Sequence, residues 1–177
     1  DDLNTRSWMN NKKQIIDTVY KMESQLTKHE SVVKGKSSYY QCQIYEKYED
    51  VFIPIVEQFK KMAGEGFNVF EFWVQIYKTG GYVLKHNHLP SFPELKDVPM
   101  RAGVYYLQKP KNGGNINIDN LWYDVKEDDM IMFGNHLDHY TEPNKSKKDR
   151  IICSINLAKG YIKKWNKKLE RPEFFKV

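Results

Sequence analysis

The feature that most constrains the fold is a change in the spacing of apolar residues near position 67. Before it, apolar side chains recur every three to four residues in 11–29 and in 50–63, and this spacing predicts two amphipathic helices. After it, apolar and polar residues alternate, as in NVFEFWVQIYK, and alternation is typical of strands with two different faces. Helices followed by many strands exclude a regular alternation of strands and helices around a parallel sheet.

The second predicted helix has recognisable ends. Asp50 is expected to cap its start, and Pro54 would then fall near the first turn, where a missing N–H costs little. Gly64 is placed to end this helix.

Short strands separated by Gly, Pro and Asn follow the two helices. A turn is expected at 79–81, after which residues 82–86 resume an extended segment. These features predict an α+β fold that is mainly β: an antiparallel double sheet or barrel with the helices packed on one face. The remaining predicted strands are 102–108, 116–118, 121–125, 129–133 and 150–158.

The 177 residues are expected to form a single domain with its own core. We divide it into a helical support (1–66), a strand-rich core (67–158) and a basic C-terminal extension (159–177). The extension has seven Lys or Arg against two Glu. It is interpreted either as a solvated tail or as a contact surface for nucleic acid or substrate.

Several function classes are disfavoured by composition. No apolar run is long enough to span a membrane, so no membrane partner is expected. No signal-peptide pattern precedes the first predicted helix. Cys42 and Cys153 lie far apart and form no CxxC, which is typical of reduced thiols. Together these features predict a cytoplasmic protein.

Histidine is rare in this chain, and four of its five histidines lie near the ends of two predicted strands. His86 and His88 are two positions apart, so in an extended segment they face the same side. His136 and His139 follow the strand predicted at 129–133. Imidazoles that converge from two strands suit Fe, Zn, Cu or Ni better than Ca or Mg. Three such ligands would leave coordination positions open for a substrate or O₂.

Arg150 begins the last predicted strand. By alternation it shares one face with Ile152, Ser154 and Asn156, the face expected to line the barrel interior. A buried guanidinium is costly unless it pairs with an anion. Because neighbouring predicted strands offer no obvious carboxylate partner, a bound carboxylate ligand is predicted.

Four motifs in order, between about Phe72 and Leu157, resemble the Fe(II)- and 2-oxoglutarate-dependent oxygenases. The resemblance is greatest to the prolyl-4-hydroxylase-like members and to small oxygenase-like proteins of phages and marine bacteria. The matching segments are WVQIYKTGGYVLKHNHLP, AGVYYLQKPKNGGNINI, DMIMFGNHLDHYTEP and DRIICSIN. The combination is specific, although each fragment alone would be weak.

This resemblance implies a double-stranded β-helix, the jelly-roll or cupin-like fold, with its catalytic core in 67–158. It implies an enzyme that decarboxylates 2-oxoglutarate to succinate with O₂ and hydroxylates an unidentified substrate, with ascorbate as a supporting reductant. A phage gene would place the protein in the host cytoplasm. The loop from Leu89 to Arg101, with Phe92 and three prolines, would be the substrate lid.

Residue by residue, the resemblance implies a metal site and a cosubstrate site. His86, His88 and His139 would bind Fe(II), with His136 as the alternative to His139. Arg150 would bind the remote carboxylate of 2-oxoglutarate. The resemblance also places Tyr106 and Tyr77 at the cosubstrate. Ser154 and Asn156 are expected there as well, because by alternation they share the inward face with Arg150.

One position departs from the wider family, which uses His-x-Asp or His-x-Glu where this chain has His-Asn-His. The phage-like branch often carries His-x-His. A neutral third ligand leaves Fe(II) with its full double positive charge, which favours a dianionic cosubstrate.

Two other functions remain open from the sequence. A cupin-type dioxygenase or isomerase with three histidines and no 2-oxoglutarate would explain His-x-His directly, but it leaves Arg150 without an anion. An inactive binding module would act through the basic segment 159–177. For an enzyme, the substrate could be a prolyl residue, another protein side chain, a nucleobase or a small metabolite.

Overall fold

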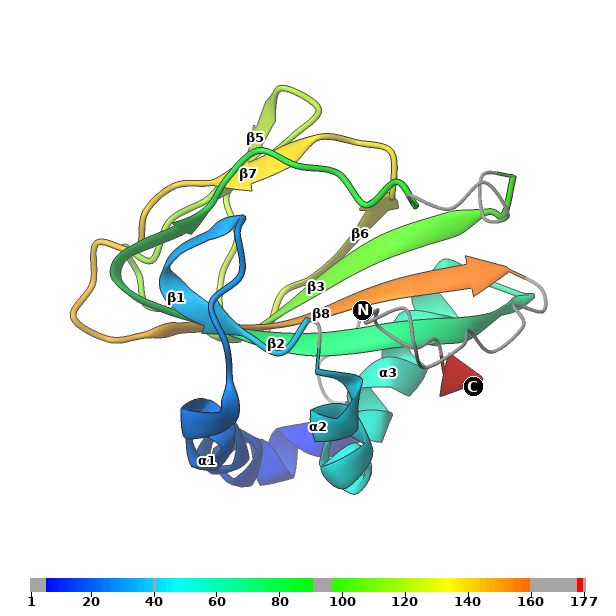
Figure 1. Cartoon of the computed structure of the whole chain (residues 1–177), viewed down its shortest axis with the longest axis horizontal. Helices are drawn as coiled ribbons and strands as arrows, with labels where there is room; N and C mark the ends of the chain where they lie inside the picture. Colours follow the sequence, from blue (N-terminus) through cyan, green and yellow to red (C-terminus); the bar gives the residue numbers. More distant parts are fainter. Residues whose placement is uncertain (1–5, 40, 91–96, 160–174, 177) are drawn as a thin grey trace.

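Two antiparallel sheets face each other, and helices cover the outer side of the larger sheet (Figure 1). The structure is a computed structural model and describes residues 6–39, 41–90, 97–159 and 175–176. This arrangement confirms the predicted α+β, mainly β fold with N-terminal helices on one sheet. The helices are α1 (Lys12–Met22), α2 (Cys42–Lys47) and α3 (Glu49–Ala63), with short 3₁₀ segments η2 (Ser7–Asn11) and η3 (Glu23–Gln25).

The larger sheet has the order β1-β2-β8-β3-β6, and β9 also pairs with β2. The smaller sheet has the order β5-β4-β7. The strands of the larger sheet are β1 (Val32–Ser37), β2 (Phe67–Val83), β8 (Arg150–Lys159), β3 (Met100–Gln108), β6 (Met130–Gly134) and β9 (Phe175–Lys176). Those of the smaller sheet are β5 (Leu121–Tyr123), β4 (Ile116–Ile118) and β7 (His139–Thr141).

Alternation along the long central strands separates two cores. One face of β2 and β8, which includes Phe72, Val74 and Ile155, packs with the buried residues of α1 and α3. The opposite face, which includes Tyr77 and Ile152, packs with residues of the smaller sheet. The inner face of β8 also carries Arg150, Ser154 and Asn156, as predicted, because each is an even number of residues from Ile152.

The helices differ in detail from their predicted spans. The first stops at Met22, and the chain is extended by Leu26. The second begins at Glu49 after Tyr48, so the prediction that Asp50 caps it is wrong. Pro54 therefore lies inside the helix, beyond the first turn, where the ring removes one backbone hydrogen bond. Gly64 does end the helix, with φ of +99°.

The turn predicted at 79–81 is wrong, because β2 runs on through it. The register with β1 shifts there, so that Val33 pairs with Tyr82 but Gly35 pairs with Tyr77. The bulged backbone forms hydrogen bonds with Asn144 instead. The N–H of Gly80 donates to the Asn144 carbonyl at 2.6 Å, and the N–H of Asn144 donates to the Gly81 carbonyl at 2.9 Å. The bulge leaves β2 unbroken and carries it toward the smaller sheet.

Some elements carry no periodic signal and were not predicted, namely β1, α2 and β7. β1 falls within the predicted helical support (1–66), so this part also contributes a strand to the larger sheet. Most of the basic extension (159–177) and the tip of the predicted lid lie outside the described residues, as does the side chain of Cys42. Cys153 carries a free, buried thiol. Among the described residues, no helix is long and apolar enough to cross a membrane.

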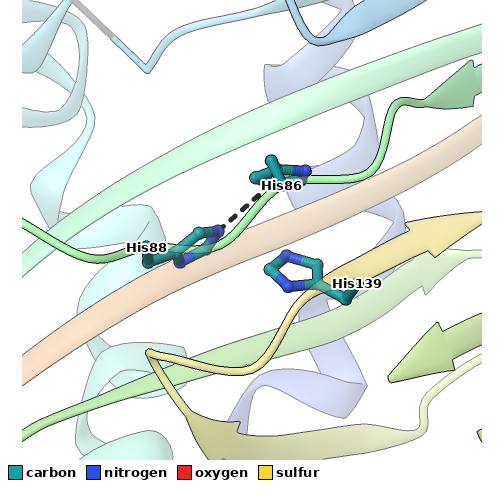
Figure 2. Close-up of side chains that lie close together, drawn as sticks. All are labelled: His86, His88 and His139. Carbon is teal, nitrogen blue, oxygen red and sulfur yellow. Dashed lines mark hydrogen bonds between the residues drawn. The ribbon is translucent and has the colours of Figure 1, made fainter. Parts of the chain in front are cut away.

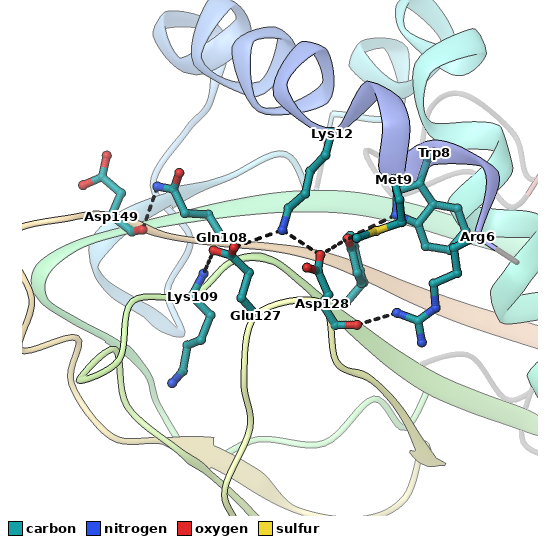
Figure 3. Close-up of polar contacts among 10 residues, drawn as sticks. Arg6, Trp8, Met9, Lys12, Gln108, Lys109, Glu127, Asp128 and Asp149 are labelled. Carbon is teal, nitrogen blue, oxygen red and sulfur yellow. Dashed lines mark hydrogen bonds and ion pairs between the residues drawn. The ribbon is translucent and has the colours of Figure 1, made fainter. Parts of the chain in front are cut away.

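A polar network joins the N-terminal helices to the loop that precedes β6 (Figure 3). The indole N–H of Trp8 donates to the hydroxyl of Tyr105 at 3.1 Å, and that hydroxyl donates to Asp128 at 2.7 Å. Lys12 pairs with the same Asp128 carboxylate at 2.7 Å. Trp8 and Tyr105 are both buried. The helices are therefore held in place by oriented hydrogen bonds as well as by apolar packing.

We expect Tyr105→Phe to lower the free energy of unfolding by about 1–3 kcal/mol, because it leaves a buried indole N–H without an acceptor. Urea unfolding at neutral pH measures the change. Tyr123→Phe is the matched control, since Tyr123 is exposed on β5 and its loss should change stability by no more than about 0.5 kcal/mol. Equal stability of the two variants would contradict the role assigned to the network.

Candidate metal centre

Three histidines meet where the chain leaves β2 and passes β7. His86 and His139 form an antiparallel bridge: the His86 N–H donates to the His139 carbonyl at 3.0 Å, and the reverse bond is 2.9 Å. The N–H of His88 donates to the Asn135 carbonyl at 2.8 Å. One nitrogen from each ring lies within 4.8 Å of the others (Figure 2). In the described part of the chain, this is the one cluster of His, Cys, Asp or Glu with metal-ligand spacing.

His136, the alternative ligand, does not join the cluster. Its side chain is exposed, and its ring lies against the backbone of Gly134. The hydrogen-bonded bridge to His86 directs His139 inward, and His139 is 4% exposed. The structure thus brings together the three histidines assigned by the resemblance.

Each imidazole of the cluster has an oxygen acceptor at Nδ1. The Nδ1 of His86 lies 2.7 Å from the Leu84 carbonyl, and that of His139 lies 3.0 Å from the Leu137 carbonyl. The Nδ1 of His88 lies 2.7 Å from Oδ1 of Asn156. A carbonyl oxygen only accepts, so these contacts put the protons on Nδ1 and leave a lone pair on each Nε2.

The geometry of the Nε2 atoms fits a metal ion. Those of His86 and His88 lie 3.3 Å apart. With both protons on Nδ1, no hydrogen bond can join them, and two lone pairs at this distance repel unless a cation lies between them. Two nitrogens bound at about 2.1 Å to one metal ion, at about a right angle, lie about 3 Å apart. The donor set therefore suits a divalent transition metal.

Burial keeps these rings neutral. Burial, together with the neighbouring His139 and His86, lowers the pKa of His88 to about 3. Burial likewise lowers the pKa of His139 to about 4. Neutral imidazole is the form that binds metal, so at neutral pH protons do not compete for the cluster.

Arg150 is 1% exposed and is held by neutral groups. Its Nη1 donates to the carbonyls of Gly113 and Glu142, and its Nη2 donates to the Thr141 hydroxyl at 3.1 Å. The guanidinium also lies 4.4 Å from the ring centre of Tyr77. Among the described residues, no carboxylate forms an ion pair with Arg150. A buried positive charge held in this way favours an anion as its missing partner.

Two tyrosines predicted at the cosubstrate lie beside Arg150. Burial raises the pKa of Tyr77 and of Tyr106, and the nearby Arg150 opposes that rise in both. The hydroxyl of Tyr77 donates to Gln75 at 2.5 Å. The hydroxyl of Tyr106, which is 3% exposed, has no hydrogen-bond partner in the described structure. It is therefore available to a ligand.

Sequence reasoning did not find Lys109, a second cation near Arg150. It is 8% exposed, and its ammonium makes one hydrogen bond within the described structure, to the Pro110 carbonyl at 3.5 Å. Burial lowers the pKa of Lys109, and Arg150 lowers it further. The alternation along β3 could not indicate this lysine, because it follows the last residue of the strand.

Ser154 and Asn156 lie on the inner face of β8 as predicted, but they have different surroundings. Ser154 faces Trp73 and Val104 in the neighbouring strands and makes no side-chain hydrogen bond among the described residues. Asn156 bonds to His88. The structure places Asn156 at the metal cluster, away from Arg150 at the other end of the strand.

The solved structures that are similar to this fold include two enzymes. One is a prolyl-4-hydroxylase from Pseudomonas putida, with a TM-score of 0.56 and 15% identity over 85% of this chain and 87% of that chain. The other is SnoK, a non-heme alpha ketoglutarate dependent carbocyclase from nogalamycin biosynthesis. Its TM-score is 0.64, with 13% identity over 85% of this chain and 76% of that chain. No family model matches the sequence, and no curated protein matches it.

The fold class follows from the two similar structures and from the sheet topology. The chain has a jelly-roll fold similar to that of the prolyl-4-hydroxylase and of SnoK, which agrees with the fold that the sequence resemblance implies. Function resides in the site and not in the fold, so the activity depends on what the three histidines and Arg150 can bind.

Proposed function

We propose that this protein is an Fe(II)- and 2-oxoglutarate-dependent oxygenase that hydroxylates its substrate. The observation that carries the proposal is the spacing between the histidine cluster and Arg150. The guanidinium bonds to the hydroxyl of Thr141, which lies on the same face of β7 as His139, two residues away. Two residues of a strand span about 7 Å.

This spacing matches a five-carbon dicarboxylate. The terminal carbons of extended 2-oxoglutarate are about 5 Å apart, so one end can bind at the histidine cluster while the other reaches Arg150. Arg150 would pair with the remote carboxylate through two charge-assisted hydrogen bonds. The hydroxyl of Tyr106 would donate to the same carboxylate, and the positive charge of Lys109 would favour it.

His86, His88 and His139 would hold the iron through Nε2. When bound, iron would supply the oxidative decarboxylation of 2-oxoglutarate to succinate and the hydroxylation. The protein contributes fixed imidazole orientations and a buried cationic group at the far end of the cosubstrate. Preset orientations lower the entropic cost of bringing the reactants together.

The test is a titration of the anaerobic Fe(II) protein with 2-oxoglutarate, followed through the weak visible charge-transfer band, and then measurement of succinate after O₂ is added. We expect saturable binding and succinate formation. Fe(II) binding without any binding of 2-oxoglutarate would contradict the proposal.

The third histidine favours a second candidate, a cupin-type metal dioxygenase that needs no 2-oxoglutarate. His88 stands where the wider oxygenase family has a carboxylate, and its ring nitrogen lies within the cluster. This candidate leaves the charge of Arg150 without an anion, so we rank it second. The same titration separates the two.

The substrate of the reaction is a separate proposal. The candidates are a protein side chain, a nucleobase and a small metabolite. Contact with nucleic acid through 159–177 would rest on residues mostly outside the described ones. Mass spectrometry of a host lysate incubated with the protein, Fe(II), ascorbate and 2-oxoglutarate would reveal the substrate by the addition of one oxygen atom.

A further inference from the structure

A buried carboxylate lies behind one of the three histidines. Glu71, on β2, is 5% exposed, and its Oε1 accepts a hydrogen bond from Nδ2 of Asn156 at 2.6 Å. Asn156, on β8, is 2% exposed, and its Oδ1 lies 2.7 Å from Nδ1 of His88. A continuous chain of two short hydrogen bonds therefore joins the carboxylate to the imidazole.

The sheet itself builds this chain. Glu71 and Asn156 are directly opposite each other in the antiparallel pairing of β2 with β8. Their side chains leave the same inner face, where directly opposed residues are within about 5.5 Å. Trp73, two residues along β2, packs its ring against that of His88 with 5.7 Å between the ring centres. The backbone register fixes Glu71 opposite Asn156, and the packing against Trp73 holds the ring of His88, which lies in the segment after β2.

Glu71 determines which way the Asn156 amide points. The carboxylate only accepts hydrogen bonds, so it holds the NH₂ group and turns Oδ1 toward His88. With the opposite orientation, the NH₂ group would face the Nδ1–H of His88, and two donors would meet. The carboxylate thus acts through Asn156 to keep the Nε2 lone pair of His88 directed at the cluster.

The charge of Glu71 also bears on the metal. Three neutral imidazoles leave a divalent ion with its full charge, whereas two imidazoles and a carboxylate reduce it by one. Hydrogen-bonded partners behind metal-bound histidines raise the basicity of the ligand, and their loss typically costs about 10- to 100-fold in metal affinity. In a buried site, screening by water is weak, so the charge of Glu71 polarises the hydrogen bonds that run through Asn156 to the His88 imidazole and thereby acts on the ion.

We propose that Glu71 and Asn156 are positioning residues for the metal, and that Glu71 supplies from behind His88 the negative charge that a directly bound carboxylate would otherwise give. This inference rests on the proposed metal site. It does not depend on 2-oxoglutarate or on the substrate.

The experiment measures Co(II) affinity at neutral pH by competition with a chromophoric chelator. Glu71→Gln keeps the shape and an acceptor but removes the charge, and Asn156→Ala breaks the chain. Each should weaken Co(II) binding about 10- to 100-fold. The double variant should be no weaker than Asn156→Ala alone, because residues that act in series are not additive. Cys153→Ala, one residue along β8 from Ser154 and on the opposite face of the sheet, is the control and should bind as wild type does.

A second readout excludes a purely structural effect. The visible absorption bands of bound Co(II) report the donor strength of its ligands, so Glu71→Gln should shift them, whereas Cys153→Ala should not. Thermal unfolding of the metal-free variants identifies any that do not fold. If Glu71→Gln does not fold, the comparison of Asn156→Ala with Cys153→Ala is the test.

The outcomes separate the two proposals. Absence of any metal binding by wild type would overturn the metal site and the proposed function with it. Wild-type binding with an unchanged affinity in Glu71→Gln or in Asn156→Ala would overturn the present inference alone. Additive losses in the double variant would mean that Glu71 does not act through Asn156, and they would overturn it as well.

Discussion

Replacing His139 with alanine is expected to abolish stoichiometric Fe(II) binding, while His136→Ala keeps it. His139 contributes one of the three Nε2 atoms of the cluster, and two imidazoles cannot maintain the geometry of the site. We expect the loss to exceed the roughly 100-fold limit typical of residues that only support a ligand. Anaerobic Fe(II) titration with metal analysis measures it. His86→Ala should behave in the same way.

His136 is a stringent control for this prediction. It is the same residue type, three positions from His139, and its side chain is exposed outside the cluster. Loss of iron in His136→Ala together with retention in His139→Ala would show that the ligand from this segment has been misassigned.

The second large effect is expected at Arg150. Arg150→Ala should weaken 2-oxoglutarate binding by about two orders of magnitude or more, since each charge-assisted hydrogen bond of a bidentate pair contributes about 1.5–3 kcal/mol. Fe(II) binding should survive, because Arg150 is not a ligand. Arg150→Lys should recover part of the affinity, since an ammonium cannot form the two parallel bonds of a guanidinium. The readout is the anaerobic titration described above.

Two controls make the result at Arg150 interpretable. The guanidinium also holds the carbonyls of Gly113 and Glu142, so the thermal unfolding of each variant must be recorded. Arg101→Ala removes an exposed arginine from β3 and should leave 2-oxoglutarate binding unchanged. Wild-type affinity in a folded Arg150→Ala would contradict the oxygenase proposal and favour the three-histidine dioxygenase.

Much of the fold could be read from local patterns. The change of apolar period near position 67 separates helices from strands because each secondary structure repeats its faces at its own interval. The same alternation placed Arg150 on the inner face of β8, and the ordered motifs selected His86, His88 and His139 from five histidines. These features depend on neighbours along the chain, so the sequence alone is enough to indicate them.

Short elements were missed because they have no period of their own. β1 and β7 are strands only because β2 and β4 offer them hydrogen-bonding partners. For a related reason, the sequence pattern did not predict that β2 continues through Gly80. The glycine pair predicts a turn locally, but the loop at Asn144 supplies the backbone partners that keep the chain extended.

The inward-facing residues and the candidate metal ligands could be predicted from the sequence. What each inward residue touches depends on how the strands are brought together in three dimensions. Asn156 was assigned to the cosubstrate because it shares a face with Arg150, yet it bonds to His88 and to Glu71. That partnership depends on the register of β2 against β8, and the two residues are 85 positions apart. Register between distant strands is set by the packing of both sheets together, so no local pattern in either strand encodes it.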